Sequence, residues 1–105
     1  MLITTSDSIP EKKIVKTLGL VRGNTVRTRW LGSNISAALR NLVGGEVPEY
    51  TQMLSDARDE AIKRMEKHAK DMGADAVVTL RFTTTEAMSG GTEILAYGTA
   101  VKLGK

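Results

Sequence analysis

Residues 54–78 read LSDARDEAIKRMEKHAKDMGADAVV, a long charged helix pattern that stops at Met72 and Gly73 and passes directly into an apolar strand. Because a single glycine separates the two elements, the helix must lie close to the sheet that the strand joins. Gly73 is expected to end the helix in a left-handed conformation, which glycine adopts without steric strain. The stretch therefore predicts a helix packed on a sheet, and it indicates no chemistry by itself.

The apolar residues of this helix recur on one side, and the opposite side is charged. Three acidic residues stand four positions before a basic one, an arrangement that stabilises a helix by about 0.2–0.5 kcal/mol per pair. The apolar side holds Leu54, Ala57, Ala61, Ile62, Met65, Ala69 and Met72, and the pairs are Asp59 with Lys63, Glu60 with Arg64 and Glu66 with Lys70. The small residues of the apolar side favour close packing on a sheet.

Two residues that can carry charge, Arg58 and His68, fall inside the apolar arc of the helix. A charge in such a place is costly unless it finds a partner. We expect Arg58 to be an interior residue paired with a carboxylate or carbonyl group, in its own subunit or across an interface. We expect His68 to make one hydrogen bond and to stay neutral.

Strands are predicted both before and after the helices along the sequence. Leu2–Thr5 has the pattern of an edge strand, and Lys13–Val21 is apolar on both faces, with Gly23 and Asn24 at its end. After Gly73, residues 76–83 alternate, with Ala76, Val78, Leu80 and Phe82 on one face and Val77, Thr79, Arg81 and Thr83 on the other. A turn at residues 89–92 then predicts an antiparallel hairpin that returns over Ile94–Leu103. Gly98 inside that strand indicates a bulge or the close approach of another backbone.

A second, shorter helix is predicted over residues 33–43, with Ser33 or Asn34 as its cap and Gly44–Gly45 as its end. An extended segment, Thr25–Trp30, precedes it. With 105 residues and 41% hydrophobic content, the chain suits one domain, 1–105. Aromatic residues are only 4%, so the core is thin, and oligomerisation is expected to add buried area.

Composition excludes several kinds of site. The chain has no cysteine, which removes disulfides, thiolate metal sites and cysteine nucleophiles, and it has one histidine. Neither a transition-metal site built by one chain nor a Ser/His/Asp arrangement is predicted, although a ring of His68 side chains from several subunits stays an alternative. Gly90–Gly91 is a hairpin tip without the helix that a phosphate loop needs. We therefore predict no enzyme and no particular cofactor.

The charge is uneven along the chain. Residues 1–45 carry seven basic and two acidic residues, and the rest carries a net −2. The basic half could bind nucleic acid or another polyanion through Arg22, Arg27, Arg29 and Arg40. Alternation with apolar residues and the lack of an aromatic platform favour a solvated face instead. No apolar run is long enough for a membrane span, and Met1–Pro10 does not have a signal-peptide pattern, so a cytoplasmic location is expected.

Several motifs in the same order resemble the YbjQ family, often labelled a heavy-metal-binding domain. They are Ile3-Thr4-Thr5, Lys13-Ile14-Val15, Leu42-Val43-Gly44-Gly45, Tyr50, Ala57-Arg58, Gly73 to Val78, Arg81-Phe82 and Ala96 to Val101. The resemblance implies an α+β subunit with a small antiparallel sheet, one long and one short helix, similar to dodecin subunits. It also implies assembly as a ring, commonly a homopentamer. The label fits poorly with a chain that has no cysteine.

Three functions follow as hypotheses. We favour a non-enzymatic oligomeric module with a small-ligand site at subunit interfaces, in which Arg58, Arg81 and Tyr50 contact the ligand. The first alternative is polyanion binding through the four arginines named above. The second is metal binding, which rests on the family label alone.

Overall fold

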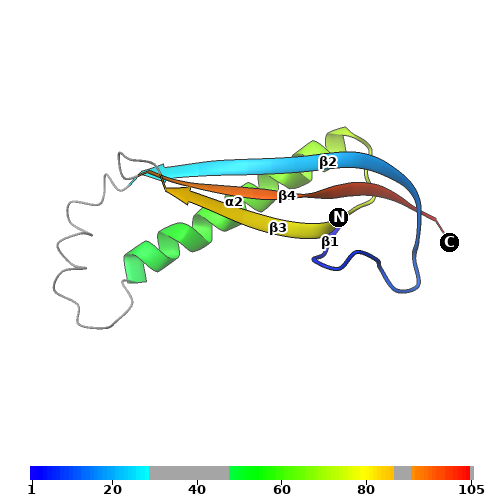
Figure 1. The fold of residues 1–105 in the computed structure, drawn as a ribbon, viewed down its shortest axis with the longest axis horizontal. Helices are drawn as coiled ribbons and strands as arrows, with labels where there is room; N and C mark the ends of the chain where they lie inside the picture. Colours follow the sequence, from blue (N-terminus) through cyan, green and yellow to red (C-terminus); the bar gives the residue numbers. More distant parts are fainter. Residues whose placement is uncertain (29–47, 87–90, 105) are drawn as a thin grey trace.

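The computed structural model describes residues 1–28, 48–86 and 91–104, which form one helix and four strands (Figure 1). The sheet has the order β1-β3-β4-β2, so β1 and β2 are its edges. The elements are β1 (Leu2–Ile3), β2 (Lys13–Thr28), α2 (Pro48–Asp71), β3 (Ala76–Glu86) and β4 (Gly91–Gly104). The α+β class and the long helix are as predicted. The shorter helix expected over residues 33–43 lies outside the described residues.

The sheet is mixed, which corrects the expectation of an antiparallel one. β4 pairs antiparallel with both β2 and β3, but β1 runs parallel to β3, with Leu2 opposite Ala76. The parallel pairing continues past β1, since the amide of Leu80 donates to the Thr4 carbonyl at 3.0 Å. The N-terminal segment therefore covers the first part of the β3 edge.

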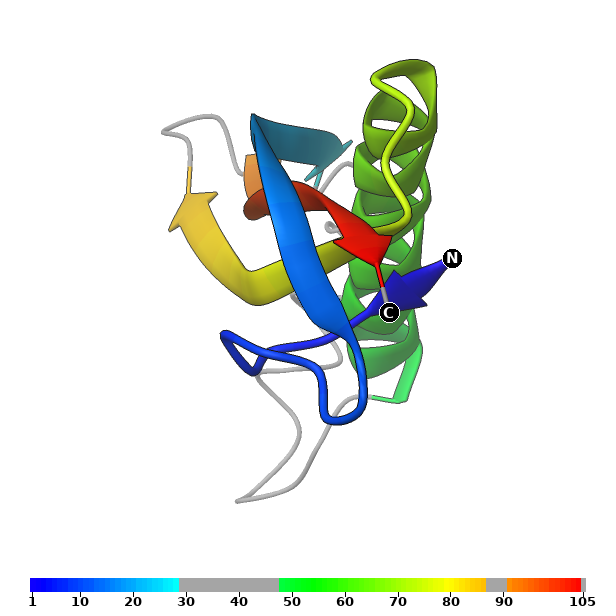
Figure 2. The ribbon, with the colours of Figure 1, turned by 90° about the vertical axis from the view of Figure 1, so that its right-hand side faces the viewer.

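Helix α2 lies on one side of the sheet and packs chiefly on β2 (Figure 2). Its small and apolar residues meet the facing residues of three strands, as the apolar arc predicted. The buried cluster is Ala57, Ala61, Met65 and Ala69 from the helix with Val21, Val77, Ile94, Ala96 and Ala100 from the sheet. Burying a side chain of the size of Met65 contributes about 1.5–3 kcal/mol. Gly73 ends the helix with a φ of 82°, which confirms the left-handed turn.

Strand β2 does not end at Gly23 and Asn24, so that prediction is wrong. Gly23 is instead the point where the helix comes closest to the strand. A Cβ at this position would collide with the Ala61 carbonyl oxygen and the Met65 amide nitrogen, and would lie 2.8 Å from the Arg64 carbonyl carbon. The glycine is therefore a contact position within a continuous strand of 16 residues.

A bulge at Thr79 changes which residues of β3 face the helix. Thr79 has a φ of 57°, and the pairing with β4 shifts between Val78 and Arg81. As a result Val78 and Arg81 lie on the same face, which corrects the alternation predicted for residues 76–83. Gly98 lies opposite this bulge, where a Cβ would be 3.0 Å from the Val78 carbonyl oxygen. The expected close approach at Gly98 is confirmed.

Among the described residues, the sheet face opposite the helix is covered at one end. There Ile9, from the N-terminal loop, packs with Ile14 and Leu103 against a small buried cluster of Ala76, Val78 and Val101. Beyond this cluster the same face carries exposed residues of β2 and β3. In the described part of the chain, no helix is both long and apolar enough to cross a membrane.

Candidate functional site

The candidate site lies on the sheet face opposite α2, which we call the open face. Cross-strand partners share a face, so the registers define it. Arg81, Tyr97 and Arg22 form one row across β3, β4 and β2, and Thr83, Leu95 and Asn24 form the next. The open face comprises Leu20, Arg22, Asn24 and Val26 on β2, Glu93, Leu95, Tyr97 and Thr99 on β4, and Arg81, Thr83 and Thr85 on β3.

The open face is hollowed over β2 and β4. The hollow has a volume of about 330 Å³ and is lined by Arg22, Asn24, Glu93 and Leu95. Asn24 donates from Nδ2 to Oε2 of Glu93 at 3.2 Å, across the two strands. The hollow therefore combines a guanidinium, an amide, a carboxylate and an apolar side chain within a small area.

The guanidinium of Arg22 is the group available for a ligand. Arg22 is exposed, and within residues 1–28, 48–86 and 91–104 its side chain makes neither an ion pair nor a hydrogen bond. Glu93 lines the same hollow but does not form an ion pair with it. An arginine presents five donors in a planar fork suited to carboxylate and phosphate groups.

The strand backbone beneath the hollow is hydrogen-bonded to side chains of the helix. The amide of Arg22 donates to Nδ1 of His68 at 3.3 Å, and Nη1 of Arg64 donates to the Asn24 carbonyl at 2.7 Å. Glu60 holds Arg64 through an ion pair of 3.6 Å. These bonds occupy outward-facing groups of an edge strand, which otherwise attract another strand. They also hold Arg22 and Asn24 in a defined place, as binding residues require.

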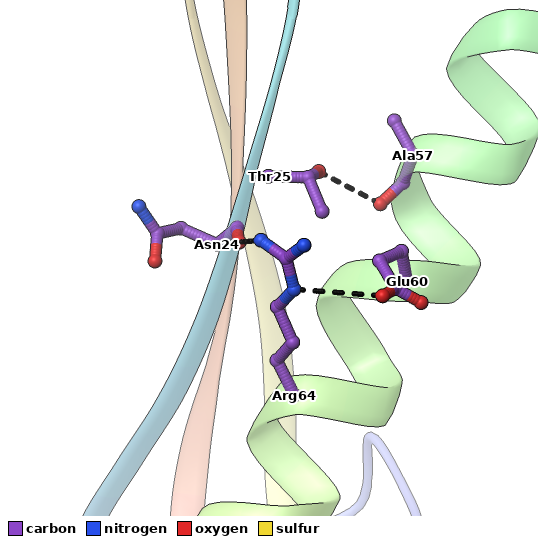
Figure 3. A network of polar contacts seen from close by, with 5 residues as sticks. All are labelled: Asn24, Thr25, Ala57, Glu60 and Arg64. Atoms are coloured by element: carbon purple, nitrogen blue, oxygen red, sulfur yellow. Dashed lines mark hydrogen bonds and ion pairs between the residues drawn. The ribbon is translucent and has the colours of Figure 1, made fainter.

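Figure 3 shows how the strand divides its side chains between the two faces. Thr25 points toward the helix and donates from Oγ1 to the Ala57 carbonyl at 2.9 Å, whereas Asn24 points away from the helix. Thr25 is buried although it is polar, and this bond satisfies its hydroxyl. The alternation confirms that the even-numbered residues of this part of β2 belong to the open face.

Of the three residues expected to contact a ligand, Arg81 alone is placed on the open face. Its Nη1 donates to the carbonyl oxygens of Thr5 at 3.0 Å and Leu80 at 2.8 Å, so its head lies toward the β3 edge. Arg58 is an exposed residue of α2, on the other side of the sheet, and the prediction that it is an interior residue is wrong. Tyr50 belongs to α2, and its side chain lies outside the described part.

The basic residues proposed for polyanion binding are not gathered on one face. The register runs without a shift between Arg22 and Arg27, and an odd spacing puts them on opposite faces of β2. Arg29 and Arg40 lie outside the described residues. His68 is exposed and, among the described residues, accepts one hydrogen bond, as expected.

Three residues of the hollow, Asn24, Glu93 and Leu95, were missed from the sequence. Asn24 was interpreted as part of a strand end because a glycine precedes it. The available signal for a continuous strand was an alternation of large side chains with smaller ones. The large side chains are Leu20, Arg22, Asn24 and Val26.

Two carboxylates with a lowered pKa lie away from the hollow. The backbone amide of Leu103 donates to Asp75 at 2.8 Å and lowers the pKa of this carboxyl group, burial opposes the shift, and Lys102 nearby adds to it. The side chain of Lys70, in contact with Glu66 at 2.9 Å, lowers the pKa of the Glu66 carboxyl group. Both shifts arise from structural contacts, one at the helix–strand junction and one on the helix surface.

Comparison with known proteins places this fold in a family. A family model described as "Putative heavy-metal-binding" matches residues 1–104. The chain belongs to the YbjQ family. A UPF0145 protein of Archaeoglobus fulgidus is 55% identical over 103 residues, which cover 98% of this chain and 95% of that protein. A UPF0145 protein of Methanococcus vannielii is 54% identical over 105 residues, with both chains fully covered.

The fold recurs in a more distant solved structure. A crystal structure of a protein of unknown function from Pediococcus pentosaceus, assigned to the DUF74 family, superimposes with a TM-score of 0.68. The two chains are 18% identical, and the match covers 99% of this chain and 98% of the other. At this identity the likeness concerns the fold alone. The names of these relatives state no activity, so the function of YbjQ proteins is unknown from these comparisons.

The YbjQ family description raises the question of a metal site. A metal site needs several ligands that converge on one point. Among the residues that the structure describes, there is no group of three or more His, Cys, Asp or Glu side chains that could hold a metal ion.

Proposed function

We propose that this YbjQ protein is a non-enzymatic, oligomeric binding module that holds a small ligand in the hollow of the open face, between subunits. The observation that carries the proposal is the exposed guanidinium of Arg22, which lines the hollow without a partner among the described residues. A ligand with a carboxylate or phosphate group would receive charge-assisted hydrogen bonds from it.

The scaffold supports this role for Arg22. Its amide and the carbonyl of the neighbouring Asn24 are bonded to helix side chains, so the strand is fixed on both sides of the close contact at Gly23. The backbone of a binding residue held in this way loses little entropy when a ligand arrives. Arg81, in the same row across Tyr97, adds a second positive charge to this end of the open face.

Exposed apolar residues beside the hollow support a subunit interface. Leu20 and Val26 lie on either side of Arg22 and Asn24 and are 64% and 56% exposed. A second subunit placed over them would bury this apolar surface and would close the hollow, whose described lining residues come from β2 and β4. A homopentamer is the arrangement that we expect from the resemblance to YbjQ proteins.

Native mass spectrometry of the intact assembly, purified without added ligands, tests the proposal. We expect a multimer of the 11.4 kDa chain with additional bound mass, and Arg22→Met should lose that mass while keeping the assembly. Arg58→Met is the matched control, because it removes an exposed arginine from the helix side of the sheet. A stable monomer, or bound mass that survives Arg22→Met unchanged, would contradict the proposal.

A further inference from the structure

We infer that the ligand of the hollow is a small zwitterion, an α-amino acid or a close analogue, with its carboxylate on Arg22 and its ammonium group on Glu93. This inference rests on the proposed function and specifies its ligand. It begins from the fact that one hollow of about 330 Å³ holds both a guanidinium and a carboxylate that do not pair with each other.

The two residues start from well-separated backbone positions. The register partner of Arg22 is Tyr97, and that of Glu93 is Val26. At about 3.3 Å per residue, the two rows are separated by roughly 13 Å along the strands. The row of Asn24 and Leu95 lies between them. The side chains of Arg22 and Glu93 both line the hollow over this middle row, so a molecule placed there with one negative and one positive group can contact both.

Glu93 keeps the capacity for a second partner. Asn24 donates to its Oε2 at 3.2 Å, which orients the carboxylate, and an ionised carboxylate has about four acceptor sites on its two oxygens. An ammonium group has three donors and suits such an acceptor. Leu95, in the middle row, offers an apolar contact for the remainder of the ligand.

The opposite charges of the hollow also disfavour other ligands. A dianion would satisfy Arg22 but bring a second negative charge toward Glu93, and a simple amine would face Arg22 with like charge. Specificity commonly depends on such repulsion as well as on attraction. The volume is at the lower end of the range of small-molecule sites, about 300–1,000 Å³, which suits a molecule of amino-acid size.

Calorimetric titration of the intact, full-length protein tests the inference with probes that carry one or both charges. L-serine, L-leucine and L-phenylalanine share the zwitterion and differ in side chain. 4-Methylpentanoate lacks only the amino group of leucine, and 3-methylbutylamine lacks only its carboxylate. We expect at least one amino acid to bind, and each leucine analogue to bind about tenfold or more weakly than leucine, a ratio that corresponds to about 1.4 kcal/mol.

Two variants separate the contributions of the two charges. In Glu93→Gln, which keeps an acceptor for Asn24, leucine and 4-methylpentanoate should bind equally, because the group that recognises the ammonium is gone. In Arg22→Met, leucine should bind no better than 3-methylbutylamine. Arg58→Met should bind all probes as the wild type does.

Each contrary result has a distinct meaning. If 4-methylpentanoate binds the wild type as tightly as leucine and Arg22→Met abolishes this binding, the zwitterion inference fails while the anion site at Arg22 stands. If none of the three amino acids binds, the inference is overturned and the retained mass in native mass spectrometry decides the proposed function. Binding that is indifferent to Arg22→Met would overturn both.

Discussion

Substitution of Gly23 by alanine probes the contact on which the site is built. The added Cβ would collide with backbone atoms of Ala61 and Met65 and lie 2.8 Å from the Arg64 carbonyl carbon, so the helix itself must move away. Overpacking of this kind costs about 1–3 kcal/mol or more. The movement would also strain the bonds from Arg64 to Asn24 and from Thr25 to Ala57, each worth roughly 0.5–1.5 kcal/mol.

We therefore expect Gly23→Ala to lower the free energy of unfolding by about 3 kcal/mol or more, a large part of the stability of a small domain. Urea unfolding followed by circular dichroism measures this loss. Gly73→Ala is the matched control, because its Cβ would meet no atom within 4 Å and only the left-handed φ of 82° disfavours it. That variant should lose about 1–2 kcal/mol. The reasoning is refuted if Gly23→Ala unfolds within about 0.5 kcal/mol of the wild type.

Three further predictions concern the turn, the bulge and a carboxylate. Gly73→Val should lose more stability in urea than Gly73→Asn, since asparagine tolerates the left-handed region; equal losses would show that backbone strain is not the cause. Thr79→Gly should raise the free energy of unfolding by about 0.5–1 kcal/mol in the same assay, because glycine adopts a φ of 57° without strain. Thr99→Gly, in strand β4, should instead lose stability. A loss at both positions would contradict strain at Thr79. The folded-state pKa of Asp75 is lowered, so the ionised carboxylate stabilises the fold above its ordinary pKa, and this stabilisation is lost as the pH falls through the folded-state pKa. The difference in unfolding free energy between wild type and Asp75→Asn should therefore shrink on acidification from about pH 5 to pH 2. A constant difference would argue against the Leu103 contact as the source of the stabilisation.

The long helix could be predicted from the sequence because its signals are local. Ion pairs between Glu60 and Arg64 and between Glu66 and Lys70 form at 3.6 and 2.9 Å, as the four-residue spacing predicted. The placement of Arg58 failed because a helical projection does not say how wide the covered arc is. α2 packs chiefly on the edge strand β2, so only a narrow stripe of the helix is buried and its flank stays exposed.

The site was harder to predict because it depends on two irregularities. Thr79 is a β-branched residue that takes a left-handed conformation, which no propensity indicates, and the resulting bulge brings Arg81 to the open face. Glycine is typical of a strand end, but Gly23 lies within the strand, at the point where the helix comes closest. Arg22 could be named as a candidate anion-binding residue from its charge. Its neighbours in the hollow could be identified only once the cross-strand register was known.

A crystal structure of the native assembly, purified without added ligands, tests the central claim most directly. Our account predicts a bound molecule with an anionic group within hydrogen-bond distance of the Arg22 guanidinium. It also predicts a neighbouring subunit that covers Leu20 and Val26 and closes the hollow. An assembly whose subunits meet elsewhere, with the open face facing solvent and only water beside Arg22, would contradict the account.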